Sequence, residues 1–109
     1  RPPATASLTS HELIAKDTLR LRFEVRRGSR ECEFVRLAGF TGPSLLAMSP
    51  ATTLRREDGL APDSYPTGTT VASRPWILSP VFGQRLLIIG HYDCTGRTVR
   101  TRLIDQDLP

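Results

Sequence analysis

Residues 18–25 read Thr-Leu-Arg-Leu-Arg-Phe-Glu-Val, and this stretch decides the fold class. Its apolar side chains occupy every second position, and charged side chains fill most of the positions between them. A period of two is that of a β-strand with one face in a core and the other in water. The stretch therefore predicts a half-buried strand and favours an all-β protein.

Turn residues follow this strand, because Arg27-Gly28-Ser29-Arg30 leads into a second apolar segment. Cys32 and Phe34 share one side of that segment, whereas Val35 and Leu37 lie on the other. A change of side within one strand is what an extra residue in the ladder produces. The pattern predicts a β-hairpin with a bulge near Phe34 and Val35.

Further strands are predicted on both sides of this hairpin, at residues 8–15, 71–78, 85–92 and 97–104. The 85–92 strand contains four consecutive aliphatic residues, which indicates burial on both faces, and Thr95-Gly96 supplies the turn after it. Pro75 indicates that its strand lies at an edge or contains a bulge.

A helix beginning at Thr9 is the alternative for the first segment, since Thr9 and Glu12 have the spacing of a capping box. The strict alternation after Asp17 argues against extending that helix.

The remaining segments lack a regular period. Residues 38–70 are rich in glycine and proline, so we expect a long loop region there. Residues 1–7 contain no acid and are expected to form a flexible head. Together these features predict a single domain over residues 1–109. Its expected fold is a small antiparallel β-barrel of about six strands, closed or partly open.

The charge balance limits the classes of partner. The chain has 15 Lys plus Arg and 11 Asp plus Glu, a net charge of +4, and Lys16 is its only lysine. Because arginine pairs with phosphates and carboxylates, this composition suggests a phosphate-bearing ligand or an acidic partner, and codon bias in a GC-rich genome is the alternative explanation. Acids alternate with the arginines through residues 20–36, so nucleic acid is not indicated. The longest apolar runs have four residues, so no membrane span is expected.

The common catalytic and metal-binding motifs are absent from the sequence. His11 and His91 are far apart, and a hydrogen-bonded strand residue is the expected role of each. Cys32 and Cys94 fall in two predicted strands, so a disulfide between them is geometrically conceivable.

Several segments occur in the order of a known domain. Residues 12–23 resemble the opening strands of the FAD-binding barrel in the ferredoxin reductase and cytochrome b5 reductase superfamily. Residues 73–79, Ser-Arg-Pro-Trp-Ile-Leu-Ser, are similar to its Arg-x-Tyr-Ser/Thr flavin motif. Residues 85–92 and 96–103 resemble the strand and the glycine-containing turn that follow it.

This resemblance implies a flavin site. Arg74 would pair with the FAD pyrophosphate, and Trp76 would stack on the isoalloxazine ring. Ile77 stands where the family has a hydroxyl, and Ser79 is the nearest substitute. Arg100 and Thr101 lie near the place of the second phosphate-binding motif.

The chain departs from that family in ways that affect the expected function. It lacks the closing barrel strand and the nicotinamide-binding domain, so a redox role requires a separate protein partner. Because Ile77 lacks the hydroxyl of the flavin motif, the flavin hypothesis has two forms. In one the domain binds FAD, and in the other it is a degenerate descendant that has lost FAD binding.

Two alternatives remain open. Residues 17–19, 35–39 and 92–97 are similar to pieces of the staphylococcal nuclease type of OB fold. That resemblance implies phosphate and calcium roles for Asp17, Arg36 and Arg97, but Ser44 replaces the catalytic base, so the domain would be inactive.

The other alternative is a non-catalytic accessory or structural subunit of a larger assembly. The acid-free head weakly favours a mitochondrial or other organellar location for it. In this interpretation Trp76 is a core residue that packs beside Phe82.

Overall fold

The computed structural model describes residues 2–58 and 75–109. These residues form strands and connections, with no helix among them. The strands are β1 (Ala4–Ala15), β2 (Thr18–Arg27), β3 (Cys32–Gly42), β4 (Ser49–Pro50), β5 (Thr53–Arg56), β6 (Trp76–Ser79), β7 (Arg85–Cys94) and β8 (Arg97–Asp107).

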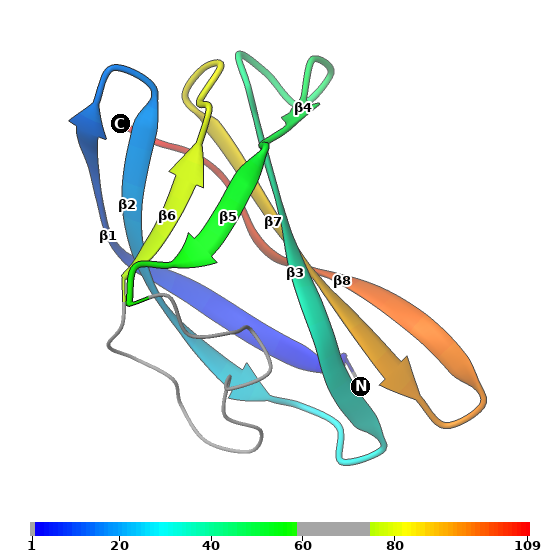
Figure 1. Ribbon diagram of the computed structural model, residues 1–109. Helices are drawn as coiled ribbons and strands as arrows, with labels where there is room; N and C mark the ends of the chain where they lie inside the picture. The colour runs from blue at the N-terminus through cyan, green and yellow to red at the C-terminus, as the bar shows by residue number, and fades with distance from the viewer. Residues whose placement is uncertain (1, 59–74) are drawn as a thin grey trace.

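The strands make two antiparallel four-stranded sheets that face each other (Figure 1). Sheet A has the order β1-β2-β6-β5, and sheet B has the order β4-β3-β7-β8. The prediction of an all-β antiparallel fold is confirmed. The predicted barrel was either closed or partly open, and the structure agrees with the open form, because the two sheets are not closed into a barrel. The order matches the A-B-E-D and C′-C-F-G sheets of an immunoglobulin-type sandwich. This is a likeness of topology and carries no function by itself.

The core lies between the sheets and is built from the inward half of each alternating pattern. Sheet A contributes the apolar side chains of residues 18–25 that the alternation singled out, together with Trp76 and Leu78. Sheet B contributes Leu86, Ile88 and Tyr92 from β7 and residues of β3 and β8. Leu21, Leu78, Leu86 and Ile88 are fully buried. Apolar burial of this kind is the main force that holds the sheets together.

The predicted hairpin between residues 18–25 and 31–37 is wrong, because β2 and β3 lie in different sheets. The connection is anchored elsewhere: the Gly28 N–H donates to the Pro3 carbonyl over 2.8 Å, and the Arg27 guanidinium donates to carbonyls of the connection itself. A Cβ on Gly28 would lie 2.1 Å from the Pro2 carbonyl oxygen, so the chain passes too closely for any other residue. Consecutive strands pair as antiparallel hairpins at β1–β2 and β7–β8, and the short strand β4 folds back on the end of β3.

The predicted bulge is confirmed. Phe34 is opposite Tyr92 and Arg36 is opposite His91, so Val35 is the extra residue in β3. The bulge restores the alternation and allows both Cys32 and Leu37 to enter the core.

Two expectations about irregular segments need correction. Ala4–Ser7 do not form a flexible head: they begin β1 and pair with Glu24–Arg27, and Ala4 is buried. The described part of the 38–70 loop region contains the end of β3, together with β4 and β5. Strand β5 pairs with β6, a partner distant in sequence, and such pairing leaves little local pattern. Residues 59–70 lie outside the described residues.

Candidate interaction surfaces

Trp76 is buried in the core and not exposed at a ligand site. Its ring stacks on Phe23 at a centroid distance of 5.8 Å, and the residue is 4% exposed. The sequence suggested two roles for Trp76, stacking on a flavin or packing in the core beside Phe82. Its position agrees with core packing, but its partner is Phe23, because Phe82 is 55% exposed.

The other residues of the predicted flavin site are not brought together. Ser79 ends β6 in sheet A, where its carbonyl accepts a hydrogen bond from Thr52 Oγ1. Arg100 and Thr101 lie on β8 in sheet B. Arg74 lies outside the described residues. The described members of this set therefore do not form a common site for a flavin, and flavin binding stays a prediction.

The nuclease-type residues are also dispersed. Asp17 lies in the β1–β2 turn, Arg36 on β3, and Arg97 at the start of β8 by the opposite end of the molecule (Figure 1). No group of three or more His, Cys, Asp or Glu side chains that could hold a metal ion occurs within residues 2–58 and 75–109.

A disulfide joins Cys32 and Cys94, as the sequence allowed. The two residues are directly opposite each other on β3 and β7. The bond closes a sequence separation of 62 residues and fixes the central pair of sheet B. Arg30, Arg97 and Thr101 line an open cleft beside it.

The β1–β2, β3–β4 and β6–β7 connections lie at the other end of the molecule (Figure 1), and these segments, with the end of β1, carry exposed apolar side chains. We call this surface the apolar end; it comprises Leu13, Ile14, Leu45, Leu46 and Phe82, with exposed fractions of 41–97%. Among the described residues the only other large hydrophobic side chain with comparable exposure is Val35. The apolar end thus holds nearly all of the exposed large hydrophobic side chains of the described chain.

The connections that carry the apolar end are fixed to one another. The Val81 N–H donates to the Asp17 carbonyl over 2.9 Å, which joins the β6–β7 connection to the β1–β2 turn. The Phe82 N–H donates to Thr41 Oγ1 over 3.1 Å, which joins the same connection to β3. A Cβ on Gly83 would lie 2.4 Å from the Gly42 carbonyl oxygen. Backbone contacts this close make the end a preformed surface.

The two connections that carry Leu45, Leu46 and Phe82 have no charged side chain of their own. Residues 43–51 and 80–84 contain no ionisable side chain, and Lys16 and Asp17 are the charged residues of the adjoining turn. Sequence reasoning missed this surface because Leu45, Leu46 and Phe82 fall in connections without a period, and Leu13 and Ile14 lie in a predicted strand whose exposed positions were not identified. Exposure of Leu45 and Leu46 can be recognised only when the core is known.

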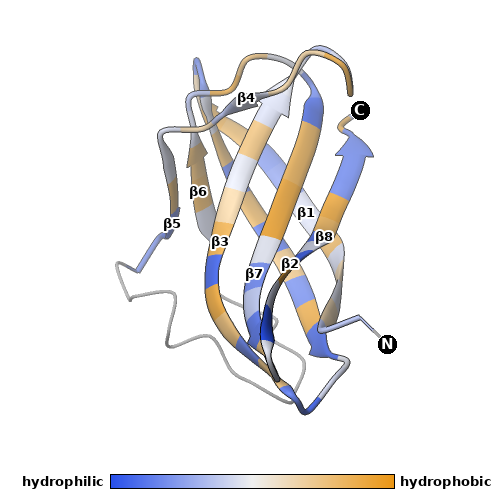
Figure 2. Ribbon diagram, turned by 90° about the vertical axis from the view of Figure 1, so that its right-hand side faces the viewer, coloured by the Kyte–Doolittle hydropathy of each residue, from blue (hydrophilic) through white to orange (hydrophobic). Residues whose placement is uncertain are grey.

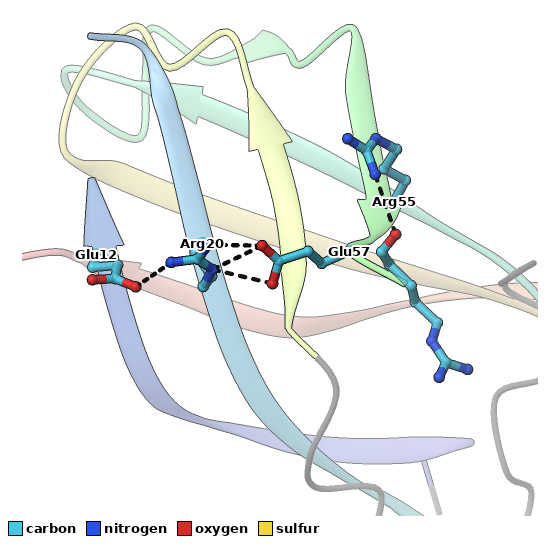
Figure 3. A network of polar contacts seen from close by, with 5 residues as sticks. Glu12, Arg20, Arg55 and Glu57 are labelled. Carbon is cyan, nitrogen blue, oxygen red and sulfur yellow. Dashed lines mark hydrogen bonds and ion pairs between the residues drawn. The ribbon is translucent and has the colours of Figure 1, made fainter. Parts of the chain in front are cut away.

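The outer face of sheet A carries an arginine network (Figure 3). The Arg20 guanidinium donates to the Glu12 and Glu57 carboxylates, with closest distances of 2.6 and 2.7 Å. The Glu57 and Glu12 carboxylates raise the pKa of Arg20, and the Arg20 guanidinium in turn lowers the pKa of Glu57. In register, Arg20 lies beside Ile77, which is 7% exposed although it points outward. We interpret the network as structural, because its acidic and basic groups pair with one another and Arg20 lies beside a buried apolar side chain.

The comparisons with known proteins give no assignment: no protein-family model, no curated protein and no solved structure matches this chain. Within residues 2–58 and 75–109, no helix is long and apolar enough to cross a membrane.

Proposed function

We propose that this chain is a non-catalytic binding domain of a larger protein assembly, and that its apolar end is the surface that contacts the partner protein. One observation carries the proposal: five large apolar side chains are exposed at one end of the molecule, on the end of β1 and on the β3–β4 and β6–β7 connections, and hydrogen bonds tie these segments together. Monomeric proteins seldom expose such a group unless it serves an interaction.

The partner is a protein with an apolar, weakly charged face. Charged residues are depleted from the centre of protein interfaces, whereas large apolar and aromatic side chains supply most of the binding energy there. The apolar end has this composition, with Leu46 at 97% exposure and Phe82 at 55%. A disulfide-linked domain persists in an oxidising compartment, so we expect the assembly to work in one.

Site-specific crosslinking tests the proposal. A photo-crosslinking amino acid at position 46 is expected to capture one defined protein in an extract of the native source, whereas the same group at position 98, on β8, is not. The captured protein is then purified, and its affinity for the full chain is measured by calorimetry. The substitutions Leu46→Asp and Phe82→Asp are each expected to weaken binding by about 2 kcal/mol or more.

Val35→Asp is the matched control, because Val35 is exposed and apolar but lies outside the apolar end. Equal loss of affinity in this control would overturn the assignment of the surface. A stable dimer in sedimentation, or binding to phosphatidylcholine vesicles, with either effect abolished by Leu46→Asp, would replace the protein partner by a second copy or a lipid surface.

The flavin hypothesis is tested separately by fluorescence titration of the full chain with FAD and FMN. Saturable quenching would revive it and would contradict a purely non-catalytic role. A colourless protein that ignores both flavins is the result we expect from the positions of Trp76 and Arg100 in opposite sheets.

A further inference from the structure

A row of three basic side chains crosses the outer face of sheet B. The register places Arg36 on β3 opposite His91 on β7, and His91 opposite Arg100 on β8. Neighbouring strands lie about 4.8 Å apart, so the two arginine backbones lie roughly 10 Å apart with His91 between them. Each guanidinium is carried on a long stem that can reach over the histidine. We call these three residues the basic row.

The arginines of the basic row have no acidic partner among residues 2–58 and 75–109. Neither Arg36 nor Arg100 forms an ion pair or a side-chain hydrogen bond within residues 2–58 and 75–109, in contrast to Arg20, Arg56, Arg85 and Arg102. Glu33 and Asp93 lie in the next row toward the β7–β8 turn without pairing to them. Two cations held side by side without an anion repel each other, so binding an anion between them is favourable.

The electrostatics of His91 agree with this geometry. Its partial burial, with the Arg36 and Arg100 charges on either side, lowers its pKa. The neutral imidazole therefore lies in a positive field, where an anion would be attracted and would favour its protonation.

A groove with polar and apolar walls adjoins the basic row. The groove is lined at one end by Arg36, His91 and Arg100 and along its length by Ala38, Phe40 and Ile89. It is bounded by Pro50 of β4 and by Ala51 in the connection to β5. Its volume is about 430 Å³, within the size range of small-molecule sites. Figure 2 shows the apolar half of β3 and β7 beside β4 and the more hydrophilic half beyond it.

We propose that this face of sheet B binds a small phosphate monoester with an apolar body. The phosphate lies over His91 and receives hydrogen bonds from the Arg36 and Arg100 guanidinium groups, whose planar fork matches phosphate oxygens. The apolar body of the ligand lies in the groove along Ala38, Phe40 and Ile89. The site is separate from the apolar end, so its failure leaves the proposed function standing.

The two histidines make the test direct, because His91 reports on the site and His11 lies on β1 in the other sheet. Phenyl phosphate is added to the isotope-labelled full chain at low ionic strength, and the imidazole signals are followed by NMR. We expect a saturable shift of the His91 signals, a rise of the His91 pKa with ligand, and little change at His11. Parallel, unsaturable shifts at both histidines would overturn the proposal.

Variants assign the effect to the basic row. Arg36→Gln combined with Arg100→Gln is expected to weaken phenyl phosphate binding roughly tenfold or more, because two charge-assisted hydrogen bonds are lost. Arg26→Gln combined with Arg30→Gln removes the same charge from two exposed arginines elsewhere and should weaken it less than about threefold. Equal losses of affinity in the two double variants would show that only nonspecific electrostatic attraction holds the ligand, and would overturn the proposal. Single Arg100→Gln, on the exposed face of an edge strand, serves if the double variant does not fold.

Three further ligands test its chemistry. Inorganic phosphate should bind more weakly than phenyl phosphate, and equal affinity would remove the groove from the site. Benzoate and phenyl sulfate should also bind more weakly, because each carries only one negative charge. If either binds as tightly as phenyl phosphate, the phosphate class is wrong.

Discussion

The outer faces of the two sheets use the same residue type in opposite ways. On sheet A, Arg20 is neutralised by Glu12 and Glu57 and lies over a buried isoleucine. On sheet B, Arg36 and Arg100 flank His91, and no acidic side chain in the described part of the chain forms an ion pair with either arginine. The comparison shows why net charge alone does not indicate function, because only the pairing of each arginine separates structural charges from charges available to a ligand.

The inner faces differ as well. Sheet A is fixed to the core by the stacked rings of Phe23 and Trp76, whereas sheet B has a covalent link between its two central strands. The following predictions test both differences, beginning with the largest expected effect.

Trp76→Ala should be the most damaging change. It removes a fully packed ring between the sheets and leaves a cavity, which costs about 3–5 kcal/mol of the free energy of unfolding. Urea unfolding followed by circular dichroism measures it. Phe82→Ala is the matched control, because Phe82 is largely exposed, and a comparable loss there would contradict the described core.

Removal of the disulfide by Cys32→Ala together with Cys94→Ala should cost about 2–4 kcal/mol, since the unfolded chain regains the freedom of a long loop. The same urea experiment measures this, and reductant should lower the stability of the wild type but not of the variant. In the variant, amide exchange should accelerate on β3 and β7 more than on β2. Unchanged exchange on β3 and β7 would show that sheet B is rigid without the bond.

Acid should destabilise the protein partly through His91. Because the folded-state pKa of His91 lies below its ordinary value of 6.5, the unfolded chain binds its proton more readily. The contribution of His91 to stability is therefore complete above pH 6.5 and is lost as the pH falls from there through the folded-state pKa. His91→Gln should flatten this part of the stability profile, measured by thermal unfolding between pH 5 and 7. His11→Gln serves as the control, and an equal flattening in that variant would contradict the role of the basic row.

Glu57→Gln should have the smallest effect. The lowered pKa of Glu57 means that its pairing with Arg20 stabilises the fold above the ordinary glutamate pKa and that this contribution disappears as the pH falls through the folded-state value. The pair is at the surface, so the loss at neutral pH should be slight and should vanish in high salt. A large, salt-independent loss would show that the network does more than neutralise Arg20. Thermal unfolding at two salt concentrations distinguishes these results.

The sequence predicted elements better than their arrangement. The alternation in residues 18–25, the bulge at Val35 and the turn at Thr95-Gly96 are local signals, and each is confirmed. The β2–β3 hairpin was wrong because turn residues do not reveal whether a connection stays in one sheet; the deciding contact, Gly28 with Pro3, is distant in sequence. Strands β4 and β5 are too short to produce a period.

The candidate surfaces show the same limit. The arginine excess suggested a phosphate or an acidic partner, but only the strand register places Arg36 and Arg100 on either side of His91. Leu46 is exposed because other apolar residues fill the core, and the sequence of the β3–β4 connection contains no pattern that predicts this exposure.

The crossing of the chain from sheet A to sheet B between β2 and β3 has a consequence for the rate of folding. The central pairs, β2 with β6 and β3 with β7, join residues that are 43–62 positions apart, whereas the β1–β2, β3–β4 and β7–β8 pairs are local. Folds dominated by distant contacts reach the native state in milliseconds to seconds, because the loops must close before the contacts form. The Cys32–Cys94 bond joins two of these distant strands in advance. An oxidised chain should therefore refold faster than a reduced one.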